Sequence, residues 1–136
     1  MKRSSTAVWN GSGKEGSGTI TSESKLLNNV SYTSSTRFDV AEGTSPEELI
    51  AAAHASCFTM KLSFVLDEAG TTAESIETTC TITIEDFVIN NSHIVVKAKA
   101  PGMSAEKFQK CAEDAKTNCP VSKALNTNIT MEAQLI

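Results

Sequence analysis

Two of the four cysteines stand where a thiol could take part in chemistry. Cys57 lies in the middle of the segment AAAHASCFTMKL, whose small residues leave room for a partner surface or a small substrate. Cys119 precedes Pro120, which disfavours helical geometry at the cysteine and favours a new helical turn after it. That places Cys119 near a helix N-cap, where backbone N–H groups stabilise a thiolate. Spacing alone permits either thiol as the nucleophile, and a structural role for each stays open.

The other two cysteines have patterns typical of core residues. Cys80 falls on the apolar face of an alternating segment, and Cys111 on the apolar stripe of a helical segment. Free cysteine is among the most buried residue types. We therefore expect both thiols to be part of the core.

Charged residues near Cys57 suggest a way to ionise it. Glu47 can face the same side of a helix as Cys57, but the two are ten residues apart, ~15 Å along a straight helix. Arg37 is long enough to link them: a guanidinium held by Glu47 could point its other donors at the thiol and lower its pKa. The alternatives are a surface arginine and a carboxylate that favours a helix N-terminus.

His54 precedes Cys57 by three residues, a poor arrangement for a nucleophile and its base, so we expect a packing or supporting role for His54.

Composition and motifs argue against several other classes. The chain has 136 residues, a net charge of −4 and no basic cluster, which argues against nucleic acid or an anionic membrane as partner. It contains two histidines and neither a CxxC nor an HExxH motif, so no metal site is expected. A phosphate-binding loop is also missing.

The element that must position Cys57 is a long helix predicted from Thr44 to Gly70. Ser45 is a good N-cap, Pro46 suits the first helical position, and Glu48 completes a capping box. Gly70 is a plausible stop. Because the segment is apolar over most of its circumference, we expect a buried central helix.

The remaining pattern predicts strands on either side of this helix and a second helix near the end. A basic N-terminal start without an apolar core is unlike a secretory signal, so we expect a cytoplasmic protein with reduced thiols. The order predicts an α+β fold, with helices packed on a curved antiparallel sheet, in a single domain over residues 1–136. The expected strands are 5–9, 19–22, 30–40, 75–87, 93–100 and 127–136, with turns at Asn28-Asn29 and Asn90-Asn91, a helix over 105–118 and a shorter helical piece to Asn126.

Two long segments together resemble a known family. The chain is similar to the OsmC (osmotically inducible protein C) branch of the OsmC/Ohr superfamily in two segments, TRFDVAEGTSPEELIAAAHASCFTMKLSFVLDEAG and the later NCPVSKAL. The resemblance extends over nearly the whole chain and implies an antioxidant thiol peroxidase of the stress response. Such an enzyme reduces organic hydroperoxides, and hydrogen peroxide less well, without a metal, flavin or haem cofactor. It also implies an intertwined homodimer with two long central helices and a dithiol reductant, a lipoylated protein.

The resemblance also gives roles to four residues. Cys57 matches the reacting cysteine and Cys119 the resolving cysteine, so that the two form a redox-active disulfide. Arg37 matches the arginine that holds the thiolate, and Glu47 the carboxylate that pins this arginine. Two rival hypotheses stay open: a thiol–disulfide exchange protein using the same cysteines, and a non-enzymatic dimer that binds apolar ligands.

Overall fold

A computed structural model of the chain describes residues 1–39 and 41–136. These residues form two compact units, residues 1–49 and 50–136, and the boundary falls inside one long helix. The predicted α+β class is confirmed, with strands and helices in both units.

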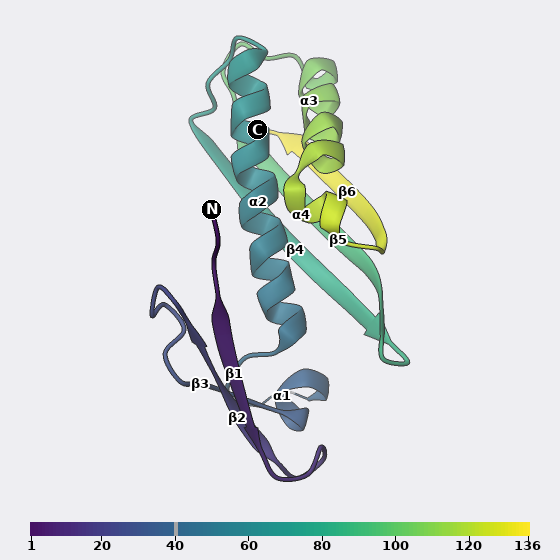
Figure 1. Cartoon of the computed structure of the whole chain (residues 1–136). Coiled ribbons are helices and arrows are strands. Elements are labelled where there is room, and N and C mark those ends of the chain that lie inside the picture. Colours follow the sequence, from purple (N-terminus) through teal and green to yellow (C-terminus); the bar gives the residue numbers. More distant parts are fainter. Residues whose placement is uncertain (40) are drawn as a thin grey trace. The chain divides into compact units, whose positions relative to one another are not determined.

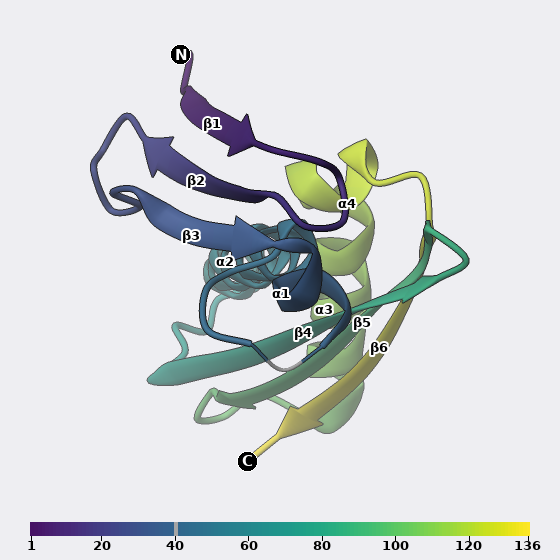
Figure 2. The ribbon, with the colours of Figure 1, turned by 90° about the horizontal axis from the view of Figure 1, so that it is seen from below.

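The first unit is built on a small antiparallel sheet. Its strands β1 (Ser5–Asn10), β2 (Ser17–Ser22) and β3 (Val30–Thr33) follow one another in space as in sequence (Figure 2). The register pairs Val8 with Thr19 and Thr19 with Ser31. The three strands predicted for this part of the chain therefore exist, although the third is much shorter than expected.

The prediction of a strand over residues 30–40 is wrong after Thr33. There the chain forms a short helix, α1 (Ser34–Phe38), and Val40 lies outside the described residues. The Thr33 side chain accepts from the Thr36 N–H, and the Thr36 side chain accepts from the Thr33 N–H. This reciprocal capping box offers the backbone a helical start that outweighs the β-forming composition. It moves Arg37 from a strand to the last turn of a helix.

The predicted long helix is present as α2 (Pro46–Glu68). Ser45 caps it, because its hydroxyl accepts from the Glu48 N–H at 3.1 Å. The Glu48 carboxylate accepts from the Thr44 hydroxyl at 2.8 Å instead of completing a capping box. Gly70, at φ +84°, ends the helix as expected, since its N–H reaches the Asp67 carbonyl at 2.9 Å.

The outer face of α2 is exposed in the single chain, which contradicts the expectation of burial all round. Phe58, Leu62 and Leu66 are fully buried, whereas Met60 and Phe64 are 62% and 58% exposed. Among the described residues, α2 is the one helix whose length and apolar composition would suffice to cross a membrane. A core helix passes the same test, and the buried row of α2 contributes to the core of the second unit.

The second unit contains a longer sheet of β4 (Ser75–Glu85), β5 (Val88–Lys99) and β6 (Asn128–Leu135), in that order. β4 and β5 form an antiparallel hairpin whose turn is Asp86-Phe87, not the expected Asn90-Asn91. Both turn residues have positive φ, the requirement of a two-residue hairpin loop. Asn90 falls at the irregularity in register between Thr83 and Ile84, so its turn-like character marks a bulge within a strand.

The expectation of a wholly antiparallel sheet is wrong for β6, which pairs with β5 in parallel. The connection between them contains α3 (Ala105–Asn118), capped by Ser104, and α4 (Pro120–Ala124). Parallel neighbours need such a crossover because a tight turn can join only antiparallel strands. The boundaries of α3 agree with the prediction, and α4 ends two residues before Asn126.

The core of the second unit lies between one face of its sheet and the inner faces of α2 and α3. Figures 1 and 2 show both helices on the same side of the β4–β5–β6 sheet. The predicted faces are confirmed, since the members expected on β5 and α3 are all buried: Ile94, Val96, Ala98, Ala100, Phe108, Cys111, Ala112 and Ala115.

Candidate functional site

Cys57 and Cys119 face each other within the second unit. Cys57 lies in the middle of α2, and Cys119 lies at the junction that ends α3 and begins α4. The two side chains are hydrogen-bonded as free thiols, although 62 positions separate them in the sequence. Pro120 creates this junction, because it cannot continue α3 and suits the first position of α4.

Three influences set the pKa of the Cys57 thiol. Burial raises the pKa, and so does the hydrogen bond with Cys119, whereas the backbone N–H of Val121 donates to the sulfur and lowers it. The donor at the start of α4 is thus directed at Cys57. Backbone N–H groups at a helix N-terminus were expected to stabilise the Cys119 thiolate. In the structure, this donor stabilises the thiolate of Cys57 instead. The net direction is upward, so Cys57 needs a further positive charge to be an effective nucleophile at neutral pH.

Cys57 is also the more accessible of the two thiols. It lines a hollow of about 220 Å³ together with Met60, Lys61, Phe64 and Pro120. Cys119 is fully buried. A small molecule entering this mainly apolar hollow meets the Cys57 sulfur first, and Cys119 stands behind it.

The expected ion pair between Arg37 and Glu47 is present in the first unit. Nε and Nη2 of Arg37 both lie 2.8 Å from Oε1 of Glu47. The Glu47 side chain is 10% exposed, and the Arg37 side chain is 35% exposed. Since α1 presents Arg37 and the first turn of α2 presents Glu47, the pair ties the guanidinium to the helix that carries Cys57.

The pair leaves hydrogen-bonding capacity unused on both partners. Nη1 of Arg37 takes no part in it and has no hydrogen-bond partner within the described part of the chain. Oε2 of Glu47 is buried and has no hydrogen-bond partner among the described residues. Such an arrangement can hold a cation firmly on one side while offering its other donors to an anion.

His54 is fully buried, and both of its ring nitrogens lie within hydrogen-bonding distance of serine hydroxyls. Its Nδ1 lies 2.7 Å from Ser92 Oγ on β5, and its Nε2 lies 2.7 Å from Ser122 Oγ on α4. The expectation of a packing or supporting role is therefore confirmed. The two serines were not anticipated, although Ser92 could have been noticed as a hydroxyl in line with the apolar residues of the β5 face.

The remaining cysteines differ from each other. Cys111 is buried in the core as expected. Cys80 packs against the core, but its sulfur also lies 3.1 Å from Ser92 Oγ and 3.7 Å from His54 Nδ1. Burial raises the pKa of both thiols.

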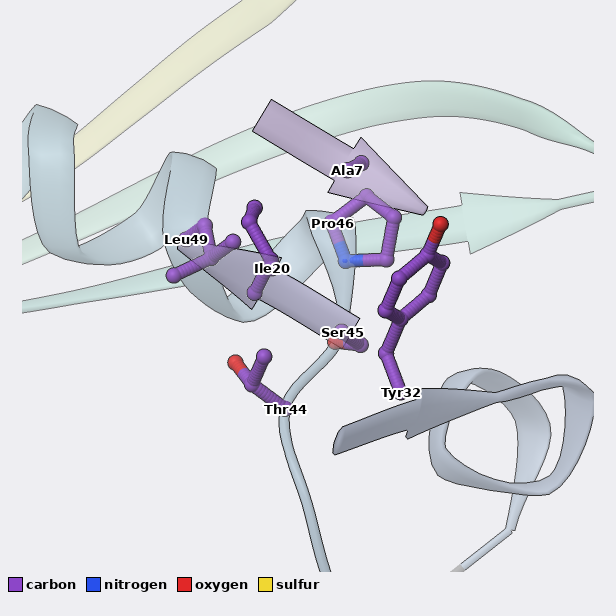
Figure 3. Close-up of a pocket in the computed structure, with 7 residues that line it drawn as sticks. All are labelled: Ala7, Ile20, Tyr32, Thr44, Ser45, Pro46 and Leu49. Atoms are coloured by element: carbon purple, nitrogen blue, oxygen red, sulfur yellow. The ribbon is translucent and has the colours of Figure 1, made fainter. Parts of the chain in front are cut away.

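A second hollow lies in the first unit and lacks groups for thiol or acid–base chemistry. Its volume is about 230 Å³, and Figure 3 shows the seven residues around it: Ala7, Ile20, Tyr32, Thr44, Ser45, Pro46 and Leu49. The lining contains three hydroxyl groups but no carboxylate, amine, imidazole or thiol. Within the described part of the chain, no group of three or more His, Cys, Asp or Glu side chains could hold a metal ion.

Comparisons with known proteins agree with this arrangement. The family model described as OsmC-like protein matches residues 39–134. Peroxiredoxin OsmC of Escherichia coli is 43% identical over 133 residues, which are 95% of this chain and 93% of that protein. Organic hydroperoxide resistance protein-like 1 of Staphylococcus saprophyticus is 34% identical over 69% of this chain and 70% of its own length.

A solved structure gives the same result for the fold. The OsmC-like protein from Mycoplasma pneumoniae has a TM-score of 0.78 at 16% identity, over 100% of this chain and 98% of that one. The match to the family model and the near full-length similarity to a curated peroxiredoxin lead to one conclusion. The chain is a peroxidase that belongs to the OsmC family.

Proposed function

We propose that the protein reduces organic hydroperoxides to alcohols through Cys57, with Cys119 as the resolving thiol. The observation that carries this proposal is the thiol pair itself: an accessible Cys57 in a hollow, backed by a buried Cys119 in hydrogen-bonding contact. The relatives named for peroxiredoxin activity and for organic hydroperoxide resistance support the same chemistry.

The first step is attack of the Cys57 thiolate on the distal oxygen of the peroxide. The O–O bond breaks, the sulfur becomes a sulfenic acid, and the alkoxide leaves and takes up a proton to become the alcohol. Burial raises the pKa of Cys57, so the thiolate needs a cation. We assign this role to Arg37, held by Glu47, because charge-assisted hydrogen bonds from a guanidinium stabilise an anion strongly.

The second step closes a disulfide. The Cys119 sulfur attacks the sulfenic sulfur of Cys57, an S–S bond forms, and water leaves. A dithiol then reduces the disulfide by exchange and is itself oxidised. We propose the dihydrolipoyl group of a lipoylated protein as this dithiol and the cytoplasm as the location, since a disulfide there is usually transient and catalytic.

The hollow at Cys57 supports a preference for organic peroxides over hydrogen peroxide. Met60, Phe64 and Pro120 contribute apolar surface to its lining. An alkyl or aryl group gains free energy by leaving water for such a surface, whereas hydrogen peroxide has no group that gains in this way. The same lining slows further oxidation of the sulfenic acid by limiting access of water-like peroxides.

We further propose a homodimer as the working form. Met60 and Phe64 lie one turn apart on α2, and both are more than half exposed. Large apolar side chains gathered on one helix face mark an interaction surface. The molar mass in solution, measured by light scattering, tests this: a value near 14.5 kDa would contradict it.

The decisive experiment measures consumption of cumene hydroperoxide with dihydrolipoamide as reductant. Cys57→Ser should lower the rate about a thousandfold or more, because it removes the nucleophile. Cys119→Ser should complete one turnover and leave a sulfenic acid at Cys57. Cys111→Ala is the matched control, since it removes a buried thiol in the same unit and should keep the wild-type rate.

Two outcomes would reject the proposal. One is a wild-type rate in Cys57→Ser. The other is oxidation confined to Cys119 in a protein where both cysteines are present. Rapid reduction of insulin disulfides without peroxide consumption would favour thiol–disulfide exchange instead.

A further inference from the structure

Four polar side chains from four elements form one cluster in the second unit, three of them buried and one partly buried. We call them the His54 cluster: His54 on α2, Cys80 on β4, Ser92 on β5 and Ser122 on α4. The imidazole is the hub, with each ring nitrogen 2.7 Å from a serine hydroxyl. His54 and Ser92 are fully buried, and Ser122 is 7% exposed. A fully satisfied buried cluster of this kind fixes the elements that contribute to it in one arrangement.

The imidazole is neutral and has no nitrogen left for Cys57. Burial lowers the pKa of His54, so the ring has one N–H donor and one acceptor nitrogen near pH 7. Each serine hydroxyl can donate or accept, so the serines satisfy both nitrogens in either tautomer. His54 therefore does not act as the base for the thiol three residues further along α2.

The partner of His54 on α4 belongs to the turn that presents Cys119. Cys119 is the N-cap of α4 and makes no side-chain capping bond, and Pro120 has no N–H to donate. The next two residues contact α2: the Val121 N–H donates to the Cys57 sulfur, and the Ser122 hydroxyl meets His54. Two adjacent residues of α4 thus bind two residues of α2, His54 and Cys57, which are three positions apart.

α4 cannot hold this orientation by itself. It has five residues, whereas isolated helices are marginal below about a dozen. Its direction must come from tertiary contacts, and the buried Ser122–His54 bond is one of them, between α4 and the helix that carries Cys57. Ser92 fixes the other side of the imidazole to the sheet, so the ring cannot follow α4 if that helix moves.

We propose that His54 is a positioning residue: by holding Ser122, it fixes α4 so that the Val121 N–H and the Cys119 thiol both meet the Cys57 sulfur. The effect on the second step rests on the function proposed above. There the Cys119 sulfur must reach the Cys57 sulfenic acid, form the S–S bond and release water. The effect on the ionisation of Cys57 does not depend on any peroxide.

The first test measures the ionisation of Cys57 in Ser122→Ala and His54→Gln. The rate of Cys57 alkylation by iodoacetamide is followed against pH, with mass spectrometry to isolate the Cys57 peptide. Both variants should reduce the thiolate fraction near neutral pH about threefold to tenfold, because the Val121 hydrogen bond to the anion is weakened. Three other groups that bear on this sulfur are unchanged in both variants: Cys119, Lys61 of the shared hollow, and Arg37 in its proposed role.

The second test follows disulfide closure after one equivalent of cumene hydroperoxide. Both variants should close the Cys57–Cys119 disulfide about tenfold more slowly and accumulate a Cys57 sulfenic acid that dimedone traps. His93→Gln is the matched histidine control, since His93 bonds to Thr130 on β6. Ser63→Ala is the serine control, because the Ser63 hydroxyl donates to the Met60 carbonyl within its own helix.

The outcomes separate this inference from the proposed function. Ser122→Ala removes a single oxygen and should fold even if His54→Gln does not. Wild-type alkylation profiles and closure rates in a folded Ser122→Ala would overturn the inference. If the wild type consumes no peroxide, the proposed function fails, while the alkylation profiles still decide whether His54 and Ser122 position the start of α4.

Discussion

Glu47 in the first unit is held by charge, whereas His54 in the second unit is held by neutral hydrogen bonds. Among the described residues, neither Nη1 of Arg37 nor the buried Oε2 of Glu47 has a hydrogen-bond partner. In the His54 cluster both imidazole nitrogens are occupied. The incomplete pair has capacity left for a reacting anion, and the complete cluster can only fix geometry. This comparison separates residues proposed to stabilise the charge of the thiolate from residues proposed to fix the position of α4.

The largest expected effect comes from removing the charge of Arg37. Arg37→Met should raise the pKa of Cys57, because the thiolate loses its cation, and lower peroxide reduction about a hundredfold at pH 7. The alkylation rate against pH and the first-turnover rate check both values. The Lys110→Met variant, which breaks an exposed ion pair with Glu106 on α3, should leave both unchanged. An unaltered Cys57 titration in Arg37→Met would remove the charge-based role from the first unit.

A smaller effect is expected when the charge of Glu47 is removed but its shape is kept. Glu47→Gln retains an oxygen that can accept from Arg37, yet it loses the charge-assisted part of the bond, so we expect about a tenfold loss of rate. Glu48→Gln is the control, because the neighbouring Glu48 carboxylate accepts from the Thr44 hydroxyl rather than from Arg37. Equal losses in both variants would mean that helix-terminal charge, not the pinning of Arg37, is the cause.

The same division explains which features were predictable from sequence. The long helix, the second helix and the alternating faces followed from period and caps, whereas the Arg37–Glu47 contact was one of several alternatives until the family resemblance favoured it. The Ser122–His54 contact joins positions 68 apart, and no local pattern connects them. Serine is also common on surfaces, so its type gave no signal of burial.

The fold errors have a related cause. The helix over Ser34–Phe38 depends on reciprocal side-chain caps, which compete with a β-forming composition that looked decisive. The turn at Asp86-Phe87 was missed because the sequence Asn90-Asn91 is more typical of a turn. In the structure, Asn90 lies at a bulge within β5 instead. The parallel pairing of β6 is decided by the path of the crossover, which composition does not describe.

The smallest effect is a pH dependence of stability that distinguishes the neutral cluster. Burial lowers the pKa of His54 in the folded protein below the ordinary value of 6.5. As the pH falls below about 6.5, the unfolded chain takes up a proton that the folded chain refuses, so stability falls, by up to about 1.4 kcal/mol per pH unit. Below the folded pKa this contribution is fully lost and the slope ends. Urea unfolding at pH 7.0 and 5.5 should show a larger loss of stability in the wild type and in His93→Gln than in His54→Gln. An equal loss in all three would show that His54 takes up its proton as readily in the folded as in the unfolded state, and the neutral-cluster interpretation would fail.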